Sequence, residues 1–167
     1  MKSVLWSIRR PHTDNIKNGS KLDEIRKRIP QDLTSKTVNY IYETKENGGC
    51  GKVIGEFKVQ NKVYIYAEIV NGVKHLYNTA FIMPALSDEE LFTYLYDGKQ
   101  NDGWALRISD LKIYDKPKLI MQFYKPCPIK LGFKNCPVCE HYSTYTGCCM
   151  NNIDRPPQSF CYVDELE

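Results

Sequence analysis

Short runs of alternating or β-branched apolar residues recur along this chain, and their spacing limits the fold more than any other feature. Successive side chains of a strand point to opposite faces, so such runs are typical of strands with one buried face. They span residues 3–8, 37–42, 52–59, 62–70, 75–83, 103–114 and 154–163. In the 103–114 run the alternation changes phase across Ser109 and Asp110, which predicts a β-bulge.

Two or three short helices are expected beside the strands. Pro11 suits the first turn of a helix, and Ser87 with Glu90 three residues later has the capping-box spacing. We expect helices over residues 11–18 and 87–96 and a helical turn within 118–124. The Asn71-Gly72 pair between two strand-like runs predicts a hairpin. Roughly six strands with so few helices predict an α+β fold, a small mixed β-barrel.

A charged segment follows the first predicted helix and carries the pattern Gly19-x-Lys21-x-x-Glu24-x-Arg26. Glycine ends helices in a left-handed conformation, and the chain then continues in extended form to residue 30. Alternation turns Ile25 toward the core, so Glu24 and Arg26 should lie side by side on the open face. A guanidinium beside a carboxylate offers a planar donor fork for a polar ligand. The alternative is a solvated charged strand without a ligand.

The composition leaves several classes of partner open. The chain has 167 residues and a formal net charge of +3, so it permits an anionic partner without demanding one. We predict one domain over 1–167. The N-terminal apolar run is too short for a signal peptide, and no stretch approaches the roughly 20 apolar residues of a membrane span. A cytoplasmic protein with reduced thiols is therefore expected.

Six of the seven cysteines follow residue 126, and most of them lie in an insertion at about 126–153. Cys136 and Cys139 form a CxxC pair, a spacing that lets two thiolates bind one tetrahedral ion. The pattern predicts a structural Zn²⁺ held by Cys127, Cys136, Cys139 and Cys148, with His141 and Cys149 as alternates. Free reduced thiols are the alternative interpretation.

Several segments together resemble the ASCH family of the PUA-like superfamily, in its bacterial and phage-type subgroup. The likeness rests on the charged pattern from Gly19 to Arg26 and on residues 4–11, 52–57, 108–117 and 155–163. The resemblance implies a PUA-like barrel with a cleft beside the charged segment, and a protein that binds RNA or modified nucleosides. Some members resemble ribonucleases or amidohydrolases acting on acetylated cytidine. Those amidohydrolases have a threonine where this chain has Glu24, and a later glutamate that could be sought at Glu89 or Glu90.

Two functions are therefore carried forward. The first is a binding module for RNA or a nucleotide-like ligand, with Lys21, Glu24 and Arg26 as polar contacts. Trp6 and Tyr42 are the candidate stacking faces, and Trp104 is a further one. The alternative is a small hydrolase, a nucleoside amidohydrolase or ribonuclease, that uses Lys21 and Glu24 as catalytic residues. A third hypothesis, with only the cysteine segment behind it, is an interaction protein.

Overall fold

A computed structural model describes residues 3–125 and 153–165. The strands are β1 (Ser3–Ile8), β2 (Asp23–Arg26), β3 (Asn39–Glu43), β4 (Lys52–Val70), β5 (Val73–Tyr77), β6 (Asp102–Lys118), β7 (Phe123–Tyr124) and β8 (Phe160–Glu165). The α-helices are α1 (Arg10–Lys17) and α2 (Asp88–Leu95), and Glu46–Gly48 and Ile120–Gln122 form single 3₁₀ turns. The mixed α+β architecture is confirmed. The division into one domain with an insertion stays a prediction.

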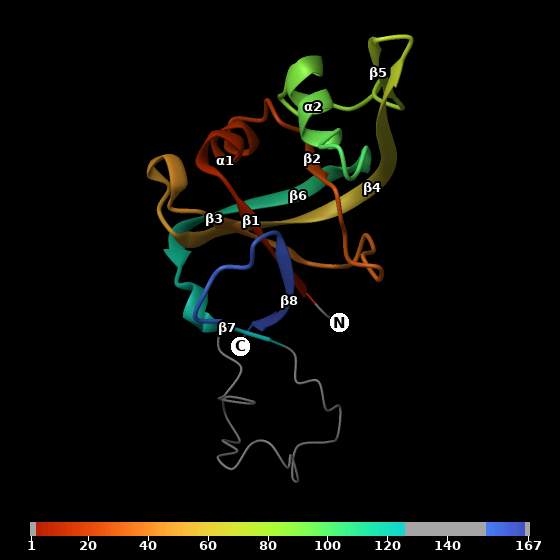
Figure 1. Cartoon of the computed structure of the whole chain (residues 1–167). Helices are drawn as coiled ribbons and strands as arrows, with labels where there is room; N and C mark the ends of the chain where they lie inside the picture. The colour runs from red at the N-terminus through yellow and green to blue at the C-terminus, as the bar shows by residue number, and fades with distance from the viewer. Residues whose placement is uncertain (1–2, 126–152, 166–167) are drawn as a thin grey trace.

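The strands form one curved sheet in the order β2-β6-β4-β3-β1-β8-β7, with β5 paired to β4 (Figure 1). β1 and β3 are parallel, and the other pairs are antiparallel. β1 and β2 are not neighbours in this order, yet the Arg26 guanidinium donates a hydrogen bond of 2.8 Å to the Ser7 carbonyl oxygen. A side chain thus bridges β1 and β2, two strands that the sheet does not pair.

Two predicted strands are merged in the structure. Residues 52–59 and 62–70 belong to the single strand β4, which is 19 residues long. Its register against β6 shifts between Val59 and Asn61, so an irregularity within one strand lies between the two runs that were predicted separately. The predicted return strand over 75–83 is also shorter, because β5 ends at Tyr77.

The predicted turn and cap chemistry is confirmed. Asn71 and Gly72 both have positive φ values, of 51° and 79°, as a two-residue hairpin with right-handed strand twist requires. Asp110 also has a positive φ, and the register of β6 shifts beside it, so the bulge is present. The Ser87 side chain accepts a hydrogen bond from the Glu90 amide and the Glu90 side chain accepts from the Ser87 amide, a complete capping box.

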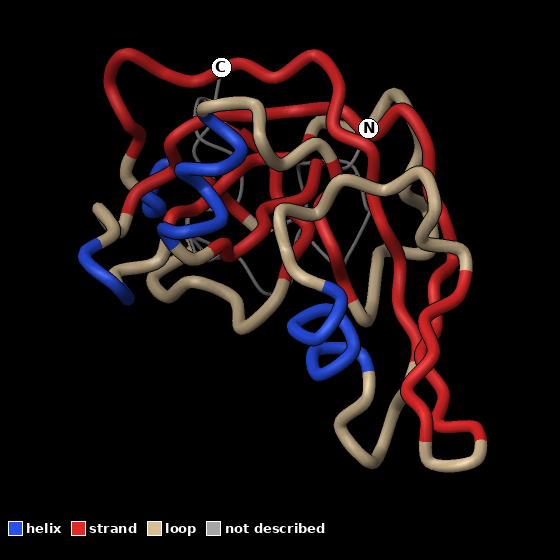
Figure 2. Tube along the Cα trace, turned by 90° about the horizontal axis from the view of Figure 1, so that it is seen from above, coloured by secondary structure: helices blue, strands red, loops and turns tan. Residues whose placement is uncertain are grey.

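Both α-helices lie on the same side of β4 and β6, above them in this view, with β2 beside them (Figure 1). Viewed from above, the β4–β5 hairpin projects away from the rest of the molecule (Figure 2). Ile25 packs against Leu91, Phe92 and Leu95 of α2, and the main barrel core gathers around Trp6, with strands β1, β3, β4 and β6 contributing. Within the described ranges, no helix is long and apolar enough to cross a membrane.

Candidate functional site

The charged segment is placed by the end of α1 and the start of β2. Asn18 caps the helix, and Gly19 follows with a φ of 78°, a left-handed conformation that glycine adopts without strain. The Lys21 amide donates back to the Asn15 carbonyl oxygen at 2.9 Å. This turn holds Lys21 beside the first residues of β2, and the strand then presents Glu24 and Arg26 on one side.

Lys21, Glu24 and Arg26 converge as a buried ionic triad. Lys21 Nζ lies 3.0 Å from Glu24 Oε2, and Arg26 Nε lies 2.8 Å from Glu24 Oε1. The three residues are only 3%, 4% and 8% exposed. Glu24 Oε2 and Arg26 Nε are at hydrogen-bonding distance from these partners but poorly aligned with them, so charge rather than a well-formed hydrogen bond joins the triad.

The triad lies deeper than alternation alone predicted. We expected Glu24 and Arg26 on an open face, but every residue of β2 is buried. Arg26 Cζ lies 5.1 Å from the centroid of the Trp6 ring, so the guanidinium is stacked on the core from its outer side. Burial of charged groups is costly unless they are paired, and this site pairs them with one another.

Glu24 is a carboxylate at neutral pH. Burial alone would raise its pKa, but Lys21 and Arg26 outweigh that effect, and the net result is a lowered pKa. Among residues 3–125 and 153–165, Lys21 Nζ is paired with Glu24. An ammonium has three N–H donors, so donors are left for a ligand.

His12 of α1 faces the same triad. Burial and the nearby Lys21 lower the pKa of His12, while Glu24 acts in the opposite direction. The imidazole is therefore neutral at pH 7, with one donor and one acceptor nitrogen. His12 Nδ1 is buried and has no hydrogen-bond partner among the described residues.

These groups line a pocket of about 630 Å³, which we call the main pocket. Its walls come from β1, α1, β2, α2 and the segment before β8: Ser7, Ile8, Arg9, His12, Lys21, Glu24, Ile25, Arg26, Leu86, Glu90, Tyr94, Gln158 and Ser159. Lys21 and Arg26 face the carboxylates of Glu24 and Glu90 there, and the third cation, Arg9, is paired with Glu46 just outside the lining. Polar and apolar walls in a cavity of this size are typical of a small-molecule or nucleotide site.

Sequence analysis missed part of this lining. Tyr94 and Gln158 reach the main pocket from elements far along the chain, and no local pattern marks them. Glu90 could be found from the sequence, because it was one of two candidates for the glutamate that the amidohydrolases carry after the charged segment. Its neighbour Glu89 is not part of the lining and instead forms an ion pair with Lys74.

The candidate stacking residues lie elsewhere. Trp6 is fully buried, and its indole N–H donates to Asn39 Oδ1 at 2.9 Å, so it offers no free face to a base. Tyr42 is 4% exposed and lines a neighbouring pocket. Trp104 packs edge-on against Tyr64 and lines neither pocket. In the main pocket, the aromatic wall is Tyr94.

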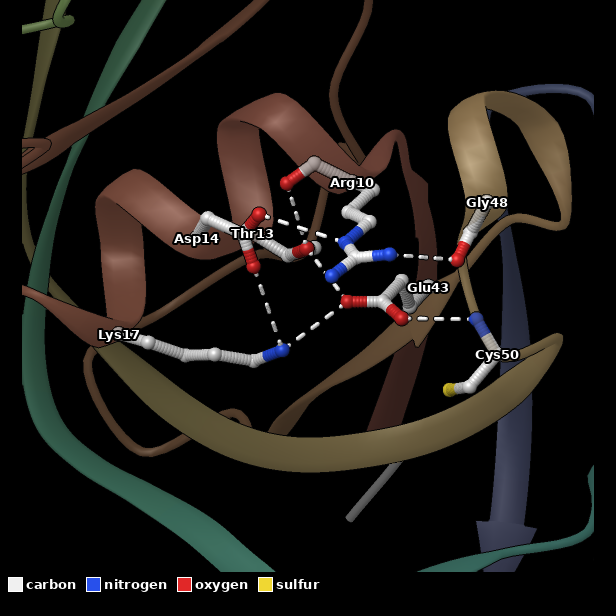
Figure 3. A network of polar contacts seen from close by, with 7 residues as sticks. All are labelled: Arg10, Thr13, Asp14, Lys17, Glu43, Gly48 and Cys50. Atoms are coloured by element: carbon white, nitrogen blue, oxygen red, sulfur yellow. Dashed lines mark hydrogen bonds and ion pairs between the residues drawn. The ribbon is translucent and has the colours of Figure 1, made fainter.

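A second buried carboxylate holds α1 in place (Figure 3). Glu43, at the end of β3, accepts hydrogen bonds from the Thr13 hydroxyl at 2.7 Å and Lys17 Nζ at 3.0 Å. Its other oxygen accepts from the Cys50 amide at 2.8 Å. Burial would raise the pKa of Glu43, but these hydrogen bonds lower it to about 2. The network fixes the helix that carries His12.

The predicted zinc ligands cannot be placed. Cys127, Cys136, Cys139 and Cys148, with the alternates His141 and Cys149, lie outside the described residues. The described part of the chain contains no group of three potential metal ligands.

The fold is that of ASCH proteins. A crystal structure of ASCH from Zymomonas mobilis is 23% identical, with a TM-score of 0.50 over 71% of this chain and 74% of that chain. Structures of two point mutants of ZmASCH have TM-scores of 0.53 and 0.52, identities of 21% and 20%, and cover 71% and 72% of this chain and 74% and 77% of theirs. No family model and no curated protein matches the sequence. The predicted barrel-like α+β fold is thereby confirmed.

Proposed function

We propose that this ASCH-fold protein binds RNA or a nucleotide-like ligand in the main pocket. One observation carries the proposal: three buried charged side chains converge at the base of a pocket of about 630 Å³. Charged groups buried beside a cavity are costly for folding and are common at functional sites. The three cations of the lining are able to bind the phosphate oxygens of such a ligand.

The roles of the side chains follow from their chemistry. Lys21 and Arg26 supply donors for a phosphate or a base edge, and Glu24 accepts from an exocyclic amine while it orients both cations. Tyr94 and Leu86 provide a flat and an apolar wall for a base. In this proposal Tyr94 takes the stacking role first expected of Trp6.

The test is fluorescence anisotropy with a fluorescein-labelled 12-nucleotide RNA of mixed sequence at low salt. The wild-type protein is expected to bind, with affinity falling as salt rises. Lys21→Met should weaken binding about 10- to 100-fold, the range for a lost hydrogen bond to a charged group. Lys36→Met is the matched control, because Lys36 is exposed and lines neither pocket.

Circular dichroism and thermal unfolding establish that each variant is folded. Equal binding by folded Lys21→Met and wild-type protein would place the RNA elsewhere on the surface. No binding by the wild type in low salt would remove the proposal.

A hydrolase is the second candidate, and one observation favours it. Neutral His12 lines the same pocket as Lys21, and a neutral imidazole beside a cavity is able to act as a general base toward water. Lys21 is paired with Glu24, and in this mechanism it stabilises negative charge instead of acting as the base. Hydrolysis of an N-acetylated cytidine or of single-stranded RNA, abolished in His12→Asn, would support catalysis. Turnover retained in that variant would exclude this mechanism.

A further inference from the structure

A second pocket of about 610 Å³ adjoins the main pocket. Ser7, Arg9 and Gln158 line both cavities, so the two share one wall. We call it the side pocket, and its lining is Ser7, Arg9, Tyr42, Thr44, Lys45, Glu46, Gly51, Ile120, Asp154, Pro156, Pro157 and Gln158. Each cavity is of a size that holds one nucleotide-sized group.

The side pocket combines flat apolar walls with an unsatisfied polar group. The apolar part of the lining comes from Tyr42, Ile120, Pro156 and Pro157. Thr44 Oγ1 is buried and has no hydrogen-bond partner in the described part of the chain. A buried hydroxyl without a partner costs free energy, and Thr44 lines the side pocket, so rotation of its side chain toward the cavity would let a ligand group satisfy the hydroxyl. The main pocket contains the equivalent feature at His12 Nδ1.

The wall that the two pockets share contains a buried hydrogen bond and an exposed cation. The Ser7 hydroxyl donates to the Pro157 carbonyl oxygen at 2.6 Å, which ties β1 to the segment that leads into β8. Arg9 forms an ion pair of 2.7 Å with Glu46, and both side chains are more than half exposed. Exposed pairs of this kind contribute little to stability, so Arg9 can exchange Glu46 for a phosphate at small cost.

Arg9 is the cation at the boundary between the two cavities. In the main pocket Lys21 and Arg26 face the carboxylates of Glu24 and Glu90. In the side pocket Lys45 faces Glu46 and Asp154, and Arg9, which lines both cavities, balances the remaining carboxylate. A neutral base and ribose suit such a cavity, with the phosphate that joins two nucleotides lying over Arg9 between the pockets.

From this arrangement we infer that the side pocket binds the nucleotide next to the one in the main pocket, on the same strand. The inference rests on the proposed function and narrows it: the ligand is a strand of at least two nucleotides, whose linking phosphodiester contacts Arg9. A lone nucleoside or mononucleotide would use half of the site.

The test is competition against the labelled 12-nucleotide RNA. Nucleoside 5′-monophosphates, 5′-phosphorylated dinucleotides and tetranucleotides serve as competitors. For the wild type, we expect a dinucleotide to bind about 10-fold more tightly than a mononucleotide. The further gain in affinity from a dinucleotide to a tetranucleotide should be smaller than that. Each added nucleotide also brings a phosphate, and the added charge alone would raise the affinity. A variant that changes no charge is therefore needed to separate this charge effect from binding in the side pocket.

Thr44→Val supplies that variant, because it removes an unpaired hydroxyl and no charge. It should weaken dinucleotide binding about 3- to 10-fold and leave mononucleotide binding unchanged. Arg9→Gln should also reduce the advantage of the dinucleotide, whereas Arg28→Gln, at an exposed site that lines neither pocket, should not.

The outcomes separate the two proposals. If mononucleotides and dinucleotides bind equally, or if Thr44→Val leaves dinucleotide binding unchanged, the side pocket is not a nucleotide subsite, although the main pocket keeps its assignment. If no competitor and no labelled RNA binds the wild type, the proposed function fails and this inference fails with it.

Discussion

At the scale of single residues, the site depends on Glu24, which keeps two buried cations together. The sequence pattern identified Lys21, Glu24 and Arg26 correctly as neighbours, since spacing along a turn and a short strand is local information. It could not predict their burial. That depends on α1, β1 and the segment before β8, which close over β2 from distant parts of the chain.

Removing the carboxylate should therefore be costly. Glu24→Gln leaves Lys21 and Arg26 buried without a counter-charge, and loss of one member of a buried ion pair costs about 3–5 kcal/mol. Urea denaturation should show a loss of this size in the free energy of unfolding. Glu46→Gln is the control, because the Glu46 side chain is 61% exposed and its pair should contribute under about 1 kcal/mol. Equal, small effects for the two variants would mean that the triad is not buried as described.

At the scale of elements, the sequence predicted the position of α1 along the chain but not the contacts that hold the helix against the sheet. Pro11 and Gly19 marked its ends well. Nothing in the local sequence linked it to Glu43, because that contact joins residues 30 positions apart. The same helix carries His12, which lines the main pocket, so the Glu43 network drawn in Figure 3 also holds His12 in position.

The network predicts an acid-dependent loss of stability. The pKa of Glu43 falls from 4.5 to about 2 on folding, so its contribution is complete above pH 4.5 and is lost as the pH falls toward 2. A shift of this size corresponds to roughly 3 kcal/mol. Glu24, whose pKa is also lowered, adds to the loss in the same direction.

Urea denaturation across pH 2–7 checks this prediction. Glu43→Gln should be less stable than wild type at pH 7, and its stability should change less between pH 4.5 and 2. A wild-type protein whose stability is flat through that range would contradict the network.

At the scale of the whole molecule, sequence reasoning predicted the barrel class because alternation and turn residues are repeated along the chain. The family resemblance implied a cleft beside the charged segment, but the sequence could not predict its lining, which runs from Ser7 to Ser159. The merged strand β4 shows the same limit: pairing with β6 continues through residues 60–61, between the two strands that were predicted separately.

The zinc site remains a prediction from spacing alone. Protein purified without added metal should contain about one zinc per chain, measured by elemental analysis. A Cys136→Ser, Cys139→Ser double variant should lose it, while Cys50→Ser, outside the cysteine segment, should retain it. A metal-free wild-type protein after gentle purification would favour free thiols.

The most direct test of the central claim is an NMR titration of ¹⁵N-labelled protein with a 5′-phosphorylated dinucleotide. The account predicts that the amide shifts change first and most at Lys21, Glu24, Arg26 and His12, with smaller changes at Thr44. Changes confined to the projecting β4–β5 hairpin, or no changes at millimolar ligand, would contradict it.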